Sequence, residues 1–176
     1  RSYTFQLRDD VRFHDGERFN AEAVKTNFDR VHEPKNALYA QLELGPYLGT
    51  TVVDEFTARI ELSESYAPLL AHLSQSQLGI VSPRALSTHG NQVNLHPTGT
   101  GPFRFDSSQT GQSITFVRNP DYWDKGKPYL DKIVFRIIPD ANTRALALEA
   151  GDIDYIPSYD MSSNDAMRLK QAKGIV

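Results

Sequence analysis

Hydrophobic and polar residues alternate over residues 3–7, and this period of two predicts a half-buried strand at the start of the chain. The period then lengthens to the helical one, which predicts a helix from Asn20, as its cap, to His32, ahead of Pro34. Strict alternation returns over residues 51–62 and predicts a hairpin. Shorter helices are predicted at residues 37–44, 68–76, 83–86 and 164–172.

The second half of the chain has a different order of elements. A polar loop at residues 87–98 precedes a predicted hairpin over residues 103–116. Residues 133–138 are apolar on both faces, as an interior strand is, and residues 141–150 and 153–156 are predicted to follow as a helix and a strand. We expect this βαβ unit to be parallel and right-handed.

Together these elements predict an α/β protein, with helices and a mixed sheet, that divides near Pro83. At 176 residues and 39% hydrophobic content, the chain can bury a core as one domain or as two small ones. It starts without Met, and a new apolar run begins at its end, so we expect it to be a piece of a longer protein.

Charge and composition exclude several classes of function. The net charge is −3, whereas a nucleic-acid surface needs a clustered basic face. The chain has no cysteine, so disulfides and thiolate metal sites are impossible. No apolar run approaches the roughly 20 residues that span a bilayer.

The glycines of HPTGTGPFRF, residues 96–105, raise the possibility of a phosphate loop. Such a loop follows a strand and opens a helix, because the helix N-terminus supplies the N–H donors. Here a loop precedes and a strand follows, and the Lys-Ser/Thr of a P-loop is missing. The stretch is therefore predicted to be a rigid corner, in which glycines adopt unusual backbone angles and prolines fix the entry and exit.

No motif for metal binding or catalysis emerges from the sequence. None of the five histidines has the helical spacing of a zincin, and the turn at His14-Asp15-Gly16 is interpreted as solvated, with Asp15 bonding its own backbone. No nucleophile elbow or S-x-x-K is present. We therefore predict neither a metal, nor a cofactor, nor an enzyme.

Two features near the second hairpin are candidates for ligand contact. Tyr122 and Trp123 follow a strand end, and packing against the core is favoured over a role in the wall of a cleft. Arg118 lies at the C-terminal end of its predicted strand, where open α/β sheets place ligands, although a surface arginine has no such role in most proteins.

Four stretches stand out along the chain, in the order YTFQLRDDVRFHDGERFNAEAV, PTGTGPFRF, VRNPDYW and YLDKIVFRIIPDANTRALALEAGDID. Together they resemble one family, the family 5 extracellular solute-binding proteins of ABC importers, which bind dipeptides, oligopeptides or nickel. The resemblance implies a periplasmic-binding-protein-like fold of type II. Residues 1–82 then correspond to the accessory subdomain of the first lobe and residues 83–176 to part of its central mixed-sheet domain, with the second lobe and both true termini absent.

The resemblance also suggests two ligand-binding residues. Tyr39, in NALYAQL, matches a tyrosine on a helix that faces the cleft, and Arg118, in VRNPDYW, matches a basic residue that pairs with a ligand carboxylate in some members. The nickel branch has a basic residue just before the position of Ser82, where this chain has only Gln77, Leu78 and Gly79. A chelated-metal ligand is therefore disfavoured.

The resemblance implies a non-enzymatic receptor outside the cytoplasmic membrane, either periplasmic or extracellular, and attached to the membrane in Gram-positive-type cells. Its partners are a di- or oligopeptide and the permease of an ABC importer, with no nucleic acid. The alternatives are a receptor for a nickel chelate, glutathione or an oligosaccharide, because a fold does not fix its ligand, and a sensor domain of a transcriptional regulator.

Overall fold

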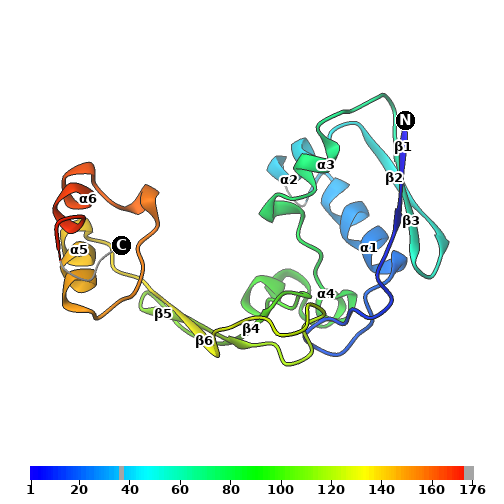
Figure 1. The fold of residues 1–176 in the computed structure, drawn as a ribbon. Helices are drawn as coiled ribbons and strands as arrows, with labels where there is room; N and C mark the ends of the chain where they lie inside the picture. The colour runs from blue at the N-terminus through cyan, green and yellow to red at the C-terminus, as the bar shows by residue number, and fades with distance from the viewer. Residues whose placement is uncertain (36–37, 173–176) are drawn as a thin grey trace. The chain divides into compact units, whose positions relative to one another are not determined.

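A computed structural model describes residues 1–35 and 38–172, and the side chains of residues 38–40 lie outside the described part. The chain divides into two compact units, each described separately (Figure 1). The first unit comprises Arg1–Asp106 and Phe116–Ile133, and the second comprises Ser107–Thr115 and Val134–Val176.

The helices and strands mostly follow the predicted order. The first unit contains β1 (Ser2–Gln6), α1 (Ala21–His32), α2 (Leu38–Leu44), β2 (Tyr47–Asp54), β3 (Thr57–Leu62), α3 (Leu69–His72) and α4 (Pro83–His89), and 3₁₀ turns at Ser76–Leu78 and Gly90–Leu95. The strands β4 (Phe103–Gln109), β5 (Ser113–Arg118) and β6 (Lys132–Arg136) contribute residues to both units. The second unit adds α5 (Ala141–Ala150), a 3₁₀ turn at Ser158–Asp160, and α6 (Ser163–Leu169).

The first sheet has the strand order β1-β3-β2 and is antiparallel throughout. β3 is the central strand, with Ala58 opposite Phe5 of β1 and opposite Val52 of β2. This confirms the predicted strand and hairpin, because the alternating residues of β3 place Ala58 and Ile60 in the core.

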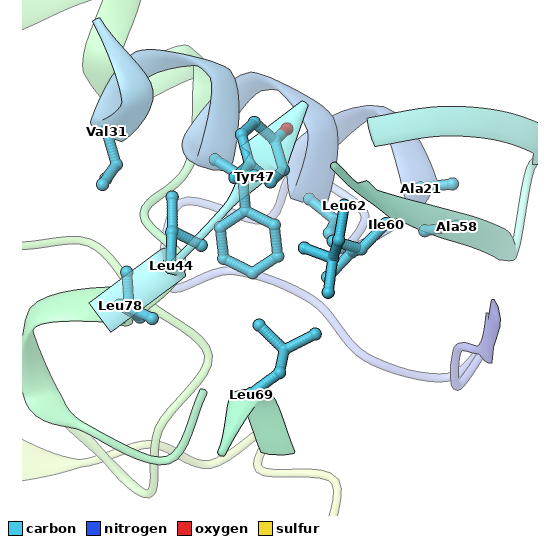
Figure 2. Packing of buried hydrophobic residues seen from close by; sticks show 11 residues of the cluster. Ala21, Val31, Leu44, Tyr47, Ala58, Ile60, Leu62, Leu69 and Leu78 are labelled. Atoms are coloured by element: carbon cyan, nitrogen blue, oxygen red, sulfur yellow. The ribbon is translucent and has the colours of Figure 1, made fainter. Parts of the chain in front are cut away.

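Leucine, isoleucine and aromatic side chains from α1, α2, α3 and the first sheet form one core (Figure 2). Leu44, Ile60 and Leu69 are almost fully buried in it. Burial of a side chain of this size contributes about 1.5–3 kcal/mol. The helical period of α1 supplies Val24, Phe28 and Val31 to the same core, as the sequence predicts.

Tyr47 adds a polar network at the edge of this core. Its hydroxyl donates to Asp29 Oδ1 at 2.6 Å and lies 2.7 Å from Thr50 Oγ1, while Lys25 forms an ion pair with the other oxygen of Asp29. Burial, followed by the hydrogen bond with Asp29, raises the pKa of Tyr47, so the phenol stays protonated and remains a donor. The network therefore ties α1 to β2.

Asn27 fastens the segment around Val81 to α1. Its side-chain amide donates to the carbonyl oxygens of Ala23 (2.9 Å) and Val81 (2.8 Å), and its carbonyl accepts from the Val81 N–H (3.0 Å). Asn27 is 1% exposed. The amide thus pairs with both backbone groups of Val81 as a neighbouring strand would, which sets the path of the chain into α4.

The second sheet has the order β4-β5-β6. The Phe105 and Phe116 rings meet edge to face at 6.1 Å, which confirms the predicted pairing of the two aromatic stretches. Asp140 caps α5 by accepting from the Thr143 N–H, and Gly151 ends the helix with a φ of 79°, as the sequence indicates.

The predicted βαβ unit is wrong in its last element. Residues 153–156 form no strand, although a strand, β6, and the helix α5 precede them. A strand exists only beside another strand, and the described residues offer none to pair with these four. Instead, Ile156 is buried, as are Ala145 and Leu169 of the same unit, and Arg136 donates to the carbonyl of Asp152 at 3.1 Å. The expected interior position of β6 is also wrong, because β6 is an edge strand of the described sheet and most of its residues are exposed.

The observed fold is mixed α/β, as predicted. The predicted boundary between residues 82 and 83 falls within the first unit. It concerns subdomains of a longer protein and stays a prediction.

We expect Asn27→Ala to lower the free energy of unfolding by about 2–4 kcal/mol, because two backbone groups of Val81 lose their partners. Urea unfolding measures this change. The exposed Asn94→Ala is the matched control and should stay within about 0.5 kcal/mol of the unmodified protein. Equal urea midpoints for the two variants would show that the Asn27 amide does not hold Val81.

Candidate functional site

The carbonyl oxygen of Gly101 joins three distant parts of the sequence. It accepts a hydrogen bond from Asn119 Nδ2 at 3.0 Å and lies 3.0 Å from His14 Nε2. The Gly99 N–H donates to His14 Nδ1 at 3.3 Å, so Nδ1 carries no proton and Nε2 is the donor. The glycine stretch therefore holds both ring nitrogens of His14.

The glycine stretch is a corner, as predicted, but the unusual backbone angles expected of its glycines are wrong, because neither Gly99 nor Gly101 has a positive φ. Hydrogen bonds to distant side chains hold the corner instead. The chain enters β4 at Phe103 rather than a helix, and the loop carbonyls accept hydrogen bonds instead of presenting N–H groups to a ligand. The Asn119 N–H also donates to the Pro102 carbonyl at 2.8 Å. The loop after β5 is thus fixed to the loop before β4.

Ser82 connects the turn at His14–Gly16 to α4. Its buried hydroxyl accepts from the Ala85 N–H as the helix cap, and it lies 2.5 Å from Asp15 Oδ2 and 2.8 Å from Glu17 Oε2. A hydroxyl has one proton, so it donates to one carboxylate at a time. Asp15 also accepts from its own backbone, at the Glu17 N–H, as expected. The interpretation of the turn as solvated is wrong, because Ser82 and Gly101 pack against it.

An aromatic pocket lies beside the Gly101 corner and encloses about 310 Å³. Its lining is mainly apolar and comes from both loops. We call the following residues the aromatic pocket: Pro102, Phe103, Tyr122, Lys127, Pro128, Tyr129 and Leu130. Tyr129 is 83% exposed, which is unusual for a residue with a large ring and marks this surface as a candidate contact site.

The two aromatic residues of the NPDYW stretch have different roles. Trp123 packs under the guanidinium of Arg8, which lies 4.7 Å from the ring centre, and this contact attaches the loop to the end of β1. Tyr122 lies 5.1 Å from Trp123, centre to centre, and lines the aromatic pocket. Packing therefore accounts for Trp123, whereas Tyr122 is open to a ligand.

Arg118 lies at the end of β5 and holds the outer wall of the aromatic pocket. Its guanidinium donates to the carbonyls of Tyr129 (2.9 Å) and Leu130 (3.3 Å) and forms an ion pair with Asp131 at 2.9 Å. Across the pocket, a hydrogen bond from Lys127 to Asp124 raises the pKa of Lys127, so its ammonium stays charged. The ligand-binding role of Arg118 stays a prediction.

The other predicted residue, Tyr39, belongs to α2. Its side chain lies outside the described part of the structure, so its role also stays a prediction. Sequence reasoning missed Phe103, Tyr129 and Leu130. The available signal was the run Pro128-Tyr129-Leu130, in which two large apolar residues follow a proline in a loop between charged residues.

Within residues 1–35 and 38–172, no group of three or more histidine or acidic side chains is arranged to hold a metal ion. The helices in the same part of the chain are all too short or too polar to cross a membrane.

Residues 1–176 match the family model described as bacterial extracellular solute-binding proteins, family 5, middle region. A glutathione-binding protein from Pectobacterium atrosepticum is 36% identical over 99% of this chain and 35% of its own length. Another, from Escherichia coli O1:K1, is 32% identical over 99% of this chain and 34% of its own length. The chain thus spans about a third of the curated relatives that it matches.

Solved structures show the same fold. The protein AgaA from Agrobacterium tumefaciens R10, bound to agropinic acid, has a TM-score of 0.89 and 31% identity, over 98% of this chain and 34% of its own. DppA from Helicobacter pylori, bound to a peptide, has a TM-score of 0.82 and 31% identity, and the match covers 98% of this chain and 37% of DppA. NikA from Brucella suis, bound to Fe(III)-EDTA, has a TM-score of 0.81 and 34% identity, and the match covers 98% of this chain and 35% of NikA.

We expect Arg118→Gln to loosen residues 127–131, because two carbonyls and one carboxylate lose their donor. Hydrogen exchange in these residues should rise about fivefold, while global stability changes by less than about 1 kcal/mol, since the ion pair is exposed. The control is Arg59→Gln, which removes an exposed pair with Glu61 in the first sheet. Unchanged exchange in Arg118→Gln would contradict the role assigned to the guanidinium.

Proposed function

Because the chain belongs to the bacterial extracellular solute-binding proteins of family 5, we propose that it is part of a receptor that binds short peptides for an ABC importer. Proteins of this family bind small ligands outside the cytoplasmic membrane and deliver them to permeases. The match of the family model to all 176 residues is the observation that carries the proposal. The relatives and solved structures are binding proteins, which confirms that the chain is not an enzyme.

The ligands of the similar proteins support a peptide-like compound with a carboxylate. The named ligands are glutathione, a peptide, agropinic acid and Fe(III)-EDTA. All are small molecules that carry carboxylate groups, and glutathione is itself a tripeptide. We therefore place glutathione beside dipeptides as the first compounds to test, ahead of longer peptides.

The contacts of Arg118 suggest how it would receive a carboxylate. Its partner Asp131 has a side chain that is 92% exposed, and an exposed pair of this kind contributes only about 0–1 kcal/mol. A ligand carboxylate can replace that of Asp131 at small cost, because the carbonyls of Tyr129 and Leu130 keep the guanidinium in place. An arginine also offers two parallel donors to a carboxylate.

The aromatic pocket would receive an apolar part of the same ligand. Tyr122 and Tyr129 provide ring surfaces together with hydroxyl groups, which suits side chains that are apolar with a polar end. The ammonium of Lys127, which is paired with Asp124, also lies at the pocket. Arg118 and the pocket would thus contact a carboxylate and an adjacent side chain.

A metal chelate is the second candidate ligand, favoured by the 34% identity with the Brucella suis protein that binds Fe(III)-EDTA. The segment before Ser82 has no basic residue, which favours the peptide. Attachment to the membrane in Gram-positive-type cells remains part of the proposal, as does delivery by this protein to a permease.

Calorimetry on the full-length protein, freed of ligand, tests the proposal. We expect glutathione or a dipeptide to bind with a micromolar Kd or tighter, about −8 kcal/mol or better, and at least tenfold more tightly than Fe(III)-EDTA. Arg118→Gln should weaken binding about tenfold, whereas Arg59→Gln should not. Preference for Fe(III)-EDTA would overturn the ligand class, and unchanged affinity in Arg118→Gln would remove this residue from the site.

The same measurement on residues 1–176 alone should give at least about 100-fold weaker binding, because this chain spans only a third of its relatives. Equal affinity for the two proteins would show that the ligand contacts lie within these residues.

A further inference from the structure

A second pocket in the first unit gathers hydrogen-bond donors that the described residues do not use. It encloses about 250 Å³ between the turn at residue 14, the end of α4 and the start of β4. We call the following residues the histidine pocket: His14, Asp15, His89, His96, Pro97, Thr98, Arg104 and Phe105. Three of the five histidines of the chain therefore line one concave surface.

Arg104 is the fixed positive charge of the histidine pocket. It is exposed on β4, between the half-buried Phe103 and Phe105. Among the described residues, no hydrogen bond or ion pair engages its guanidinium. Five N–H donors on one side of the pocket are therefore open to a ligand.

His89 and His96 supply further donors. Their rings stack at 4.1 Å with 19° between the planes, which keeps both imidazoles at the pocket. Within the described part of the chain, their ring nitrogens form no hydrogen bonds. Each neutral imidazole carries one N–H, and each gains a second donor and a positive charge on protonation.

Both oxygens of the Asp15 carboxylate and both ring nitrogens of His14 already take part in hydrogen bonds. Asp15 Oδ1 accepts from the Glu17 N–H at 3.0 Å, and Oδ2 lies 2.5 Å from Ser82 Oγ. His14 uses Nδ1 and Nε2 on Gly99 and Gly101. Among the described side chains, the unpaired donors at the pocket are the Arg104 guanidinium and one N–H on each of His89 and His96, each of whose neutral rings also keeps one acceptor nitrogen. A group that accepts several hydrogen bonds suits these donors.

We propose that the histidine pocket binds a small oxyanion, held by the guanidinium of Arg104 and the N–H groups of His89 and His96. The oxyanion is either a free inorganic anion or the carboxylate end of an organic molecule, since both offer the same acceptors. Charge-assisted hydrogen bonds from arginine suit either geometry. This site does not depend on peptide binding at the aromatic pocket.

The test is a titration of the full-length protein with sodium sulfate, followed through the ring signals of its histidines by NMR. Sodium chloride keeps the ionic strength constant, so that screening does not imitate binding. A parallel titration uses sodium acetate. We expect the signals of His89 and His96 to shift and saturate with a Kd of about 1–10 mM, while those of His32 and His72 stay unchanged.

Three variants distinguish the pocket from general attraction of anions. Arg104→Gln should weaken binding at least tenfold, and His96→Phe, which keeps a stacking ring without N–H donors, about threefold or more. Arg136→Gln removes an exposed arginine of β6 and should change nothing. Because Arg104 is exposed and unpaired with the described residues, its replacement should leave the fold intact.

Saturation by sulfate alone identifies an inorganic anion, and saturation by acetate alone identifies a carboxylate. Either result supports the site if Arg104→Gln weakens it. Linear shifts with both salts, or equal affinities for Arg104→Gln and Arg136→Gln, would overturn the proposal without affecting the assignment of peptide binding.

Discussion

The structure around the candidate site depends on the carbonyl oxygen of Gly101, which pairs with the side chains of both Asn119 and His14. A buried or half-buried backbone carbonyl must find a donor, and here two donors come from stretches 87 residues before it and 18 residues after it. This contact holds the turn before α1, the loop before β4 and the loop after β5 together. The stretch that leads into β4 contributes lining residues to both pockets, so this contact supports a wall of each.

The two pockets have opposite chemistry although they share this support. The aromatic pocket is apolar, and its arginine, Arg118, is bound by loop carbonyls and an exposed carboxylate. The histidine pocket is polar, and its arginine, Arg104, is open. An arginine that already has weak, exposed partners can exchange one of them for a ligand, whereas an open arginine only gains a partner. The first arrangement suits selective contact with a larger molecule, and the second suits a small anion.

The core of the first unit gives these loops a rigid base. Asn27 connects the core to these loops, because its amide pairs with both backbone groups of Val81 and so sets the path of the chain to Ser82. Ser82 then binds the turn that contains His14 through two carboxylates. A polar side chain buried in this way is costly unless each of its groups is paired, and both residues meet that condition in this fold.

The sequence by itself determined the elements that depend on local pattern. The period of α1, the alternation of β3 and the cap at Asp140 all follow from neighbouring residues. The four motifs also determined the family. Only the tertiary structure decided what depends on distant partners. Residues 153–156 have the composition of a strand but no described strand beside them, and Arg104 and His96 lie eight positions apart with no spacing signal that joins them. Hydrogen-bond partners and pockets form between segments, so a local pattern cannot specify them.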